Sequence, residues 1–131
     1  MNLDKAMNNA VKYAQELIRT PSLSGEEREV AYKIREYLNG MGLDKVFIDE
    51  LGDVIGVIRG RSEDILVLEG HMDHVPPGDI KLWRYDPYSA RIVDNKLYGR
   101  GSVDMKSAIA AMTAATSIIA QRENNTTLHL V

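Results

Sequence analysis

The chain has 131 residues, of which 44% are hydrophobic and 27% are charged, proportions typical of one globular domain or part of one. It carries 16 Lys and Arg residues against 19 Asp and Glu residues, a net charge of −3 without any basic run, so neither nucleic acid nor an anionic membrane is expected as a partner. The absence of cysteine excludes disulfides and thiolate metal sites, and it fits a cytoplasmic location.

The N-terminal part of the chain predicts two amphipathic helices. Residues 3–19 repeat apolar side chains with the spacing of one helical face, and Pro21 ends this pattern. A second helix is expected to begin at Ser24, whose hydroxyl suits an N-cap, with Glu27 three residues on, and to end at Asn39-Gly40. The first ten residues lack the basic and apolar regions of a signal peptide.

The following residues predict strands. Residues 46–48 and 54–58 read as a hairpin. Residues 65–68 are apolar throughout, which is typical of a central strand covered on both faces. This strand carries Gly70-His71 at its C-terminal end, the end at which open α/β sheets bind ligands.

The C-terminal part predicts a hairpin, a helix and a last strand. Residues 90–93 and 97–98 flank Asp94-Asn95, which has the chemistry of a hairpin turn. A helix is expected from near Asp104 to about Arg122, and its weakly polar run falls short of the ~20 residues that span a bilayer. A strand over residues 126–131 reaches the last residue, so we expect a chain that stops where its next functional loop should begin.

The strongest chemical signal is Gly70-His71-Met72-Asp73, a glycine-flanked His-x-Asp at the end of an expected strand. The glycine lets the backbone turn sharply, and the imidazole of His71 can bind a metal. The carboxylate of Asp73 is well spaced to accept the second imidazole N–H and so to orient the ring. The competing interpretations are a structural His71 and an Asp73 that only caps the next turn.

A second signal is Asp104, which follows Gly99-Arg100-Gly101 at the expected start of a helix. The glycines allow a close approach of the backbone, and a helix N-terminus supports a carboxylate that must stay ionised between cations. A plain helix N-cap is the other interpretation. His71 and Asp104 can hold one metal or bridge two, which indicates hydrolytic chemistry, although a catalytic zinc normally has three protein ligands.

The neighbouring polar residues receive plainer interpretations. His129 alternates with leucines and is expected to be a sheet residue. His74 is expected to point away from His71. Lys106 is expected on the surface of its helix or beside the site.

Several segments of the chain resemble the co-catalytic zinc amidohydrolases and exopeptidases, the family of acetylornithine deacetylase, succinyl-diaminopimelate desuccinylase, aminoacylase and carboxypeptidase G. They follow in order along nearly the whole chain: residues 19–27, residues 70–76, Trp83 with Asp86-Pro87, and residues 97–106. The His-x-Asp and Gly-Arg-Gly-x-x-Asp-Met-Lys motifs are the specific ones. The resemblance implies an α/β fold, an incomplete zinc-exopeptidase-like domain with a mixed, mainly parallel sheet sandwiched by helices.

By this resemblance, His71 and Asp104 are metal ligands, with Asp104 bridging two metals, and Asp73 is the catalytic-site carboxylate that polarises His71. A cis peptide bond between Asp104 and Met105 is also implied. The cofactors would be two divalent metal ions, expected to be zinc, although cobalt and manganese suit the same ligands. The implied reaction is hydrolysis of an amide bond in an N-acyl amino acid or short peptide, with a glutamate accepting a proton from metal-activated water.

The family also has features that this chain lacks. Its members carry a Glu-Glu pair a few residues beyond the strand corresponding to residues 126–131, further metal ligands, and an inserted lid domain that mediates dimerisation. We therefore expect residues 1–131 to be the N-terminal part of a metallohydrolase catalytic domain, inactive alone, whose parent is a homodimer. The alternative is a non-catalytic metal-binding or structural module that retains half of the site.

Overall fold

The helices and strands lie where the sequence pattern predicts them, with small shifts at their ends. The computed structural model describes residues 3–131, so Met1 and Asn2, the first residues of the expected domain, lie outside the described residues. The elements in chain order are α1 (Leu3–Ile18), α2 (Arg28–Asn39), β1 (Lys45–Ile48), β2 (Val54–Ile58), β3 (Ile65–Leu68), the 3-10 helix η1 (Ile80–Leu82), β4 (Arg91–Val93), β5 (Lys96–Tyr98), α3 (Lys106–Ile119) and β6 (Thr127–Leu130).

Four of the described strands form one mixed sheet in the order β1-β2-β6-β3. β1 and β2 form the expected antiparallel hairpin, and β6 joins β2 in antiparallel orientation. β6 runs parallel to β3, with Leu130 opposite Leu68. Because these two strands are parallel, their carboxyl ends share one edge of the sheet, and the segment that begins with Gly70 starts from that edge.

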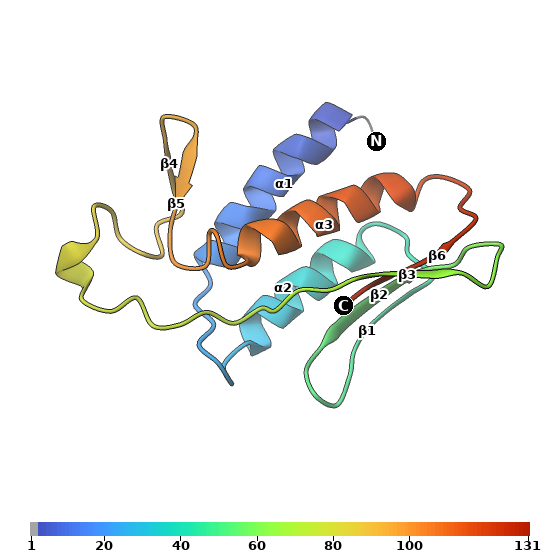
Figure 1. The fold of residues 1–131 in the computed structure, drawn as a ribbon, viewed down its shortest axis with the longest axis horizontal. Helices are drawn as coiled ribbons and strands as arrows, with labels where there is room; N and C mark the ends of the chain where they lie inside the picture. The colour runs from blue at the N-terminus through green and yellow to red at the C-terminus, as the bar shows by residue number, and fades with distance from the viewer. Residues whose placement is uncertain (1–2) are drawn as a thin grey trace.

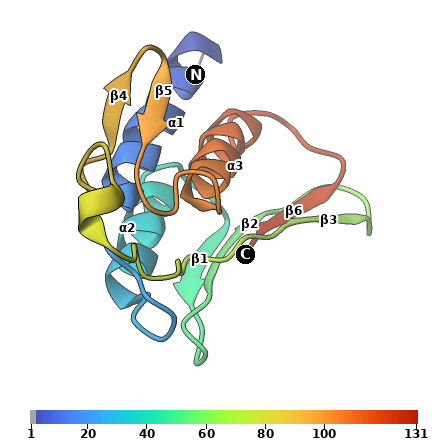
Figure 2. The same cartoon turned by 60° about the vertical axis from the view of Figure 1, so that its left-hand side comes forward.

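The helices pack on one face of this sheet. α2 contacts β1 and β2, α3 contacts β6, and α1 packs against α3 on the side away from the sheet (Figures 1 and 2). Their apolar faces meet in a core whose members include Leu17, Val30, Leu38, Ile109 and Leu130. Burial of this apolar surface is the main driving force that holds the layers together.

The weakly polar run near the C-terminus forms α3, the helix predicted there, and this helix is partly buried. Ile109, Ala110 and Thr113 are among its buried residues. Within residues 3–131, no helix combines the length and apolar character that crossing a membrane requires.

β3 does not occupy the central position that its apolar run predicts. It lies at one edge of the described sheet, and Ile65, Leu66 and Val67 are 60%, 52% and 52% exposed. The apolar side chains of β3 are suited to packing against other segments, but they do not identify those segments. The prediction of a strand buried on both faces is therefore wrong for the described residues.

The expected mixed α/β fold is confirmed, with two qualifications. One of the three strand pairings in the main sheet is parallel, so the sheet is mixed but not mainly parallel within residues 3–131. The described helices cover only one face, so the helical sandwich is half formed in this part of the chain (Figure 2).

The hairpin of β4 and β5 stands apart from the main sheet, beside α1 (Figure 1). Asp94 and Asn95 have φ angles of 49° and 59°, as a two-residue type I′ turn requires. A hydrogen bond from Gln15 Nε2 to the carbonyl oxygen of Ala90, 2.9 Å long, ties the start of the hairpin to α1.

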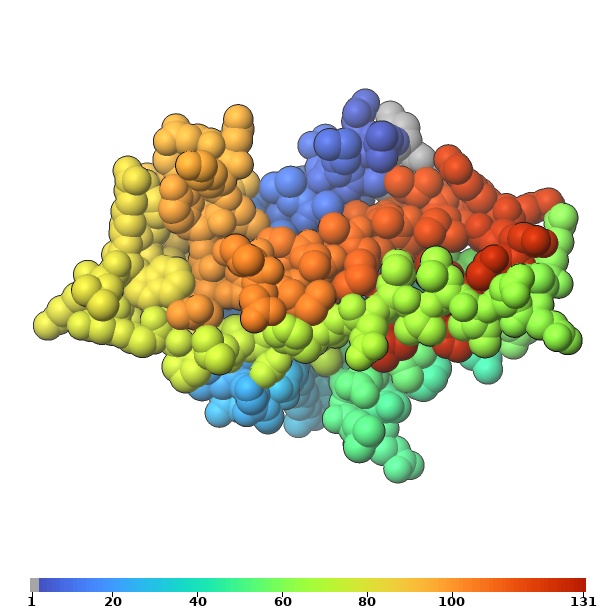
Figure 3. Space-filling model, viewed as in Figure 1, coloured from blue at the N-terminus to red at the C-terminus, as the bar shows by residue number. Residues whose placement is uncertain are grey.

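After β3 the chain follows a long irregular path over the surface toward η1. Figure 3 shows this yellow-green segment crossing the front of the molecule between α3 and α2. The backbone N–H of Gly70 donates to Val131 O at 3.0 Å, and that of His74 donates to Ser22 O at 2.8 Å. Leu23 and His74 also form an isolated parallel bridge. These contacts fix the segment that carries the predicted site.

Gly99 allows the loop before Asp104 to pass directly over the end of α1. A Cβ atom at this position would lie 2.4 Å from Ile18 Cγ2 and 3.1 Å from the carbonyl oxygen of Pro87. Ile18 is fully buried and cannot move aside without disturbing the core. The position of this loop therefore requires a residue without a side chain.

We expect Gly99→Ala to lower the free energy of unfolding by about 1–3 kcal/mol, the usual cost of overpacking a filled core. Urea denaturation measures this change. Gly40→Ala is the matched control, because its Cβ would meet no atom closer than 3.5 Å and its φ is −72°. An equal loss of stability in both variants would contradict the packing argument.

Candidate metal centre

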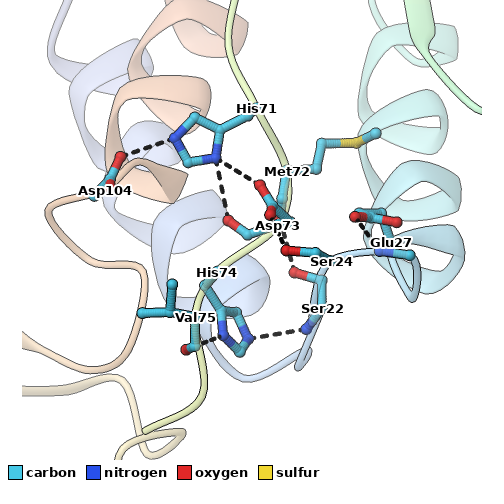
Figure 4. A network of polar contacts seen from close by, with 10 residues as sticks. Ser22, Ser24, Glu27, His71, Met72, Asp73, His74, Val75 and Asp104 are labelled. Atoms are coloured by element: carbon cyan, nitrogen blue, oxygen red, sulfur yellow. Dashed lines mark hydrogen bonds and ion pairs between the residues drawn. The ribbon is translucent and has the colours of Figure 1, made fainter.

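His71 and Asp104 meet at the edge of the sheet, although they come from segments far apart in the sequence. His71 follows β3, and Asp104 precedes the start of α3. Nε2 of His71 lies 2.8 Å from Oδ1 of Asp104 (Figure 4). The two residues predicted as metal ligands are therefore brought together.

Asp73 contacts the other nitrogen of the same imidazole. Its Oδ1 lies 2.8 Å from Nδ1 of His71. A carboxylate at each ring nitrogen favours the charged ring, and the hydrogen bond to Asp104, with a smaller contribution from that to Asp73, raises the pKa of His71. A carboxylate behind the imidazole also fixes the orientation of the ring.

The side chain of Asp104 does not cap α3, which was its plainer interpretation. Met105 occupies the N-cap position, and no side chain makes a capping hydrogen bond there. The carboxylate of Asp104 faces His71 instead, and its side chain is 83% exposed. The peptide bond between Asp104 and Met105 is cis, as the resemblance implied.

The donor set of these side chains suits a divalent cation. An imidazole nitrogen and a carboxylate oxygen are ligands that zinc, cobalt and manganese accept. The side chain of His71 is 48% exposed, so solvent reaches the space beside it and Asp104. Within residues 3–131, no group of three or more His, Cys, Asp and Glu side chains is placed to hold a metal. The described residues thus bring together one imidazole and one carboxylate that such a cation accepts.

Ser24 contacts Asp73 and does not cap α2, so its predicted role as an N-cap is wrong. α2 begins at Arg28, and Glu27 occupies the cap position without a side-chain capping bond. Ser24 Oγ donates to Oδ2 of Asp73 at 2.5 Å. This hydrogen bond is the largest reason why the pKa of Asp73 lies below its usual value.

Ser22 and His74 form a second contact between the same two segments. Ser22 Oγ donates to the carbonyl oxygen of Met72 at 2.7 Å, and its backbone N–H donates to Nε2 of His74 at 2.9 Å. Nδ1 of His74 lies 3.0 Å from the carbonyl oxygen of Val75, and the residue is 4% exposed. Both ring nitrogens of His74 are therefore used inside the protein.

Lys106 is fully buried, so the first of its two expected positions, the surface of its helix, is wrong. Nζ donates to the carbonyl oxygens of Leu17 at 2.9 Å and Thr20 at 2.6 Å. Carbonyls at the C-terminal end of a helix lack helical partners, which makes the end of α1 suited to an ammonium group. Burial lowers the pKa of Lys106 to about 8. Lys106 thus ties the segment that carries Asp104 to the end of α1.

Trp83, Arg100 and Asp86 organise the long loop between β3 and β4. The guanidinium of Arg100 lies 5.1 Å from the ring centroid of Trp83, whose Nε1 donates to the carbonyl oxygen of Pro77 at 2.8 Å. Oδ1 of Asp86 accepts the backbone N–H of Tyr88 at 2.8 Å. These contacts give Trp83 and Asp86 structural roles within the loop, and Arg100 contacts the loop from the segment after β5.

Sequence reasoning missed Ser24 and Lys106 because the local pattern favours other roles for them. A serine just before a helix has N-cap chemistry in any protein, and a lysine in the first turn of a helix is usually exposed. The available signal was that both lie within segments that carry the family resemblance, residues 19–27 and 97–106.

Comparison with known proteins gives a match to the model of Peptidase family M20/M25/M40 over residues 67–131, the range that contains His71, Asp73 and Asp104. Succinyl-diaminopimelate desuccinylase 2 of Shewanella loihica is 39% identical over 107 residues, which cover 80% of this chain and 28% of that protein. The chain spans only about 30% of the length of the curated relatives that it matches.

Solved structures show the same fold. The M20 family metallo-carboxypeptidase Sso-CP2 from Sulfolobus solfataricus superposes with a TM-score of 0.80 at 24% identity, over 92% of this chain and 29% of that chain. The YXEP protein of Bacillus subtilis, a dinuclear metal binding peptidase from the M20 family, gives a TM-score of 0.72 at 21% identity, over 98% of this chain and 35% of that chain.

We expect Lys106→Met to lower the free energy of unfolding by about 1–3 kcal/mol, because the carbonyl oxygens of Leu17 and Thr20 would lose a donor in a buried place. Urea denaturation measures the loss. Lys81→Met is the control, because Lys81 is exposed on η1. A Lys106→Met protein as stable as Lys81→Met would contradict the role of this ammonium.

Proposed function

We propose that this chain belongs to Peptidase family M20/M25/M40, whose model matches residues 67–131. The protein is a metal-dependent hydrolase of amide bonds, and residues 1–131 are the N-terminal part of its catalytic domain. The observation that carries this proposal is the imidazole of His71, which lies between the carboxylates of Asp73 and Asp104 with Nε2 2.8 Å from Asp104.

His71, Asp104 and Asp73 each have one role in the proposal. His71 binds a divalent cation through Nε2, the nitrogen that faces the second proposed ligand Asp104, while Nδ1 stays engaged by Asp73. Asp104 offers its carboxylate from the opposite segment, and because its side chain is 83% exposed, ions in solution can reach it. Asp73 orients the ring and makes it a better ligand.

The proposed cofactors are two divalent cations, with zinc as the expected metal. Their support is the His and carboxylate donor set, which suits zinc, cobalt and manganese, and the Bacillus subtilis neighbour that is itself a dinuclear metal binding peptidase. Bound cations of this kind lower the pKa of water and polarise the carbonyl of a substrate.

The glutamate that accepts the proton, and the remaining metal ligands, are proposed to lie in the part of the protein beyond residue 131. The described residues hold no third ligand beside His71 and Asp104. A cation bound by two protein side chains keeps most of its coordination for water, so residues 1–131 are proposed to be inactive alone.

The open face of the sheet supports the proposal of a larger domain. Phe47, Ile65 and Val67 are 42%, 60% and 52% exposed, and they lie on β1 and β3, the two edge strands of the described sheet. Exposed apolar surface of this kind marks a place where other structure binds. The remainder of the catalytic domain is the proposed cover, with helices on this face as the resemblance implies.

The proposed substrate is an N-acyl amino acid or a short peptide. Its support is the desuccinylase relative, whose name describes removal of a succinyl group from succinyl-diaminopimelate. The whole protein is proposed to be a homodimer that forms through an inserted lid domain, to act on small molecules and not on nucleic acid or membranes, and to work in the cytoplasm.

The second candidate is a non-catalytic module that keeps half of the metal site. The observation that favours it is the two-ligand donor set itself, since no third metal-binding side chain lies nearby in the described part of the chain. This module would bind a metal or hold a structure together without carrying out hydrolysis.

In the complete protein, we expect His71→Gln and Asp104→Asn each to lower the rate of amide hydrolysis by at least about 100-fold, because metal binding contributes several kcal/mol to such reactions. Hydrolysis of N-succinyl and N-acetyl amino acids, with the zinc content of each variant, measures the loss. Asp4→Asn is the control away from the site. Full activity in His71→Gln would contradict the proposal.

The isolated 131-residue chain separates the two candidates. We expect equilibrium dialysis to show weak or no stoichiometric zinc, because two protein ligands leave most of the coordination sphere to water. Tight binding of two zinc ions by this chain would favour the module instead. The hydrolase also requires a Glu-Glu pair encoded shortly after residue 131.

A further inference from the structure

We propose that Ser24 positions the metal-binding histidine by holding the carboxylate of Asp73 behind it. The side chains of Ser24, Asp73, His71 and Asp104 form a continuous row of polar contacts that begins at Ser24 (Figure 4). This inference rests on the proposed function, because it takes His71 as a metal ligand.

Asp73 uses one carboxylate oxygen for each neighbour. Oδ1 faces Nδ1 of His71 at 2.8 Å, and Oδ2 accepts from Ser24 Oγ at 2.5 Å. A carboxylate with a donor at each oxygen cannot rotate about its Cβ–Cγ bond without losing both contacts. Asp73 lies on an irregular segment outside any strand, so Ser24 supplies a constraint that the backbone around Asp73 does not.

Ser24 is itself held in place by the preceding residues. The backbone N–H of Ser22 donates to Nε2 of His74 at 2.9 Å, and Ser22 O accepts the N–H of His74 at 2.8 Å. Leu23 pairs with His74 in the isolated bridge. The residue after this bridge is Ser24, so the same contacts that join the two segments bring its hydroxyl to Asp73.

The hydroxyl of Ser24 has no competing role in α2. A serine carries one O–H donor, and Asp73 accepts it. Glu27 occupies the cap position of the helix, and Oε1 of Glu27 accepts the backbone N–H of Gly25 at 2.7 Å. A hydrogen bond to an ionised carboxylate is also stronger than one between neutral groups.

The expected size of the effect follows from the position of Ser24, which contacts Asp73 and not the proposed ligand His71. Partners that orient metal ligands typically change metal affinity by about 10–100-fold when they are mutated. Ser24 acts on such a partner and not on the ligand itself, so we expect a smaller change, about threefold to tenfold.

The test compares Ser24→Ala, Ser24→Thr and Ser62→Ala in the complete protein. Ser62 Oγ donates to Oδ2 of Asp64 at 3.0 Å near the start of β3, so Ser62→Ala removes the same kind of bond at the end of the strand opposite the site. The first measurement is the dissociation constant for Co²⁺ in competition with a chelator. The second is the ¹⁵N chemical shifts of the His71 ring in metal-free protein with labelled histidine, assigned with His71→Gln.

We expect Ser24→Ala to weaken Co²⁺ binding about threefold to tenfold and to change the ¹⁵N shifts of His71, because Nδ1 loses a fixed acceptor. Ser24→Thr should restore both, since it keeps the hydroxyl, and Ser62→Ala should change neither. Unchanged affinity and unchanged His71 shifts in Ser24→Ala would overturn the inference. Equal effects of Ser24→Ala and Ser62→Ala would also overturn it.

The variant His71→Gln distinguishes a failure of this inference from a failure of the proposed function. If His71→Gln binds Co²⁺ as tightly as the unchanged protein, the proposed function fails, and the inference fails with it. If His71→Gln loses the metal while Ser24→Ala alters neither measurement, only the inference about Ser24 fails.

Discussion

The candidate metal centre depends on one interaction, in which a carboxylate contacts each ring nitrogen of His71. Its partners Asp73 and Asp104 come from different segments, at 2.8 Å each. All three side chains are partly or largely exposed, and exposed ion pairs contribute little stability by themselves. The row therefore cannot hold its own segments together, and other contacts must place them.

Those contacts converge on the end of α1 and the short stretch that joins it to α2. The carbonyl oxygens of Leu17 and Thr20 bind the ammonium of Lys106, which lies two residues after Asp104 in the chain. A few residues later, Ser22 and Ser24 bind the segment that carries the His-x-Asp motif. One stretch of chain thus positions both halves of the candidate metal centre, although it contributes no metal ligand of its own.

The candidate centre and the sheet are both open in the described part of the chain. The side chain of Asp104 is 83% exposed, and Ile65 on the edge strand β3 is 60% exposed. The exposed apolar strand β3 and the exposed carboxylate of Asp104 have the same physical explanation, because each presents a surface that is suited to contact with further structure. The length comparison agrees, because this chain spans about 30% of its curated relatives.

The sequence by itself determined the helices, the hairpins and the identity of His71, Asp73 and Asp104 as the candidate site, because periodicity, turn residues and glycine-flanked motifs act locally. Only the tertiary structure decided that Ser24 binds Asp73 and does not cap α2, that Lys106 is buried, and that β3 lies at an edge. The reason is physical. A local pattern limits what a side chain can do, but its partner depends on which distant segments pack beside it.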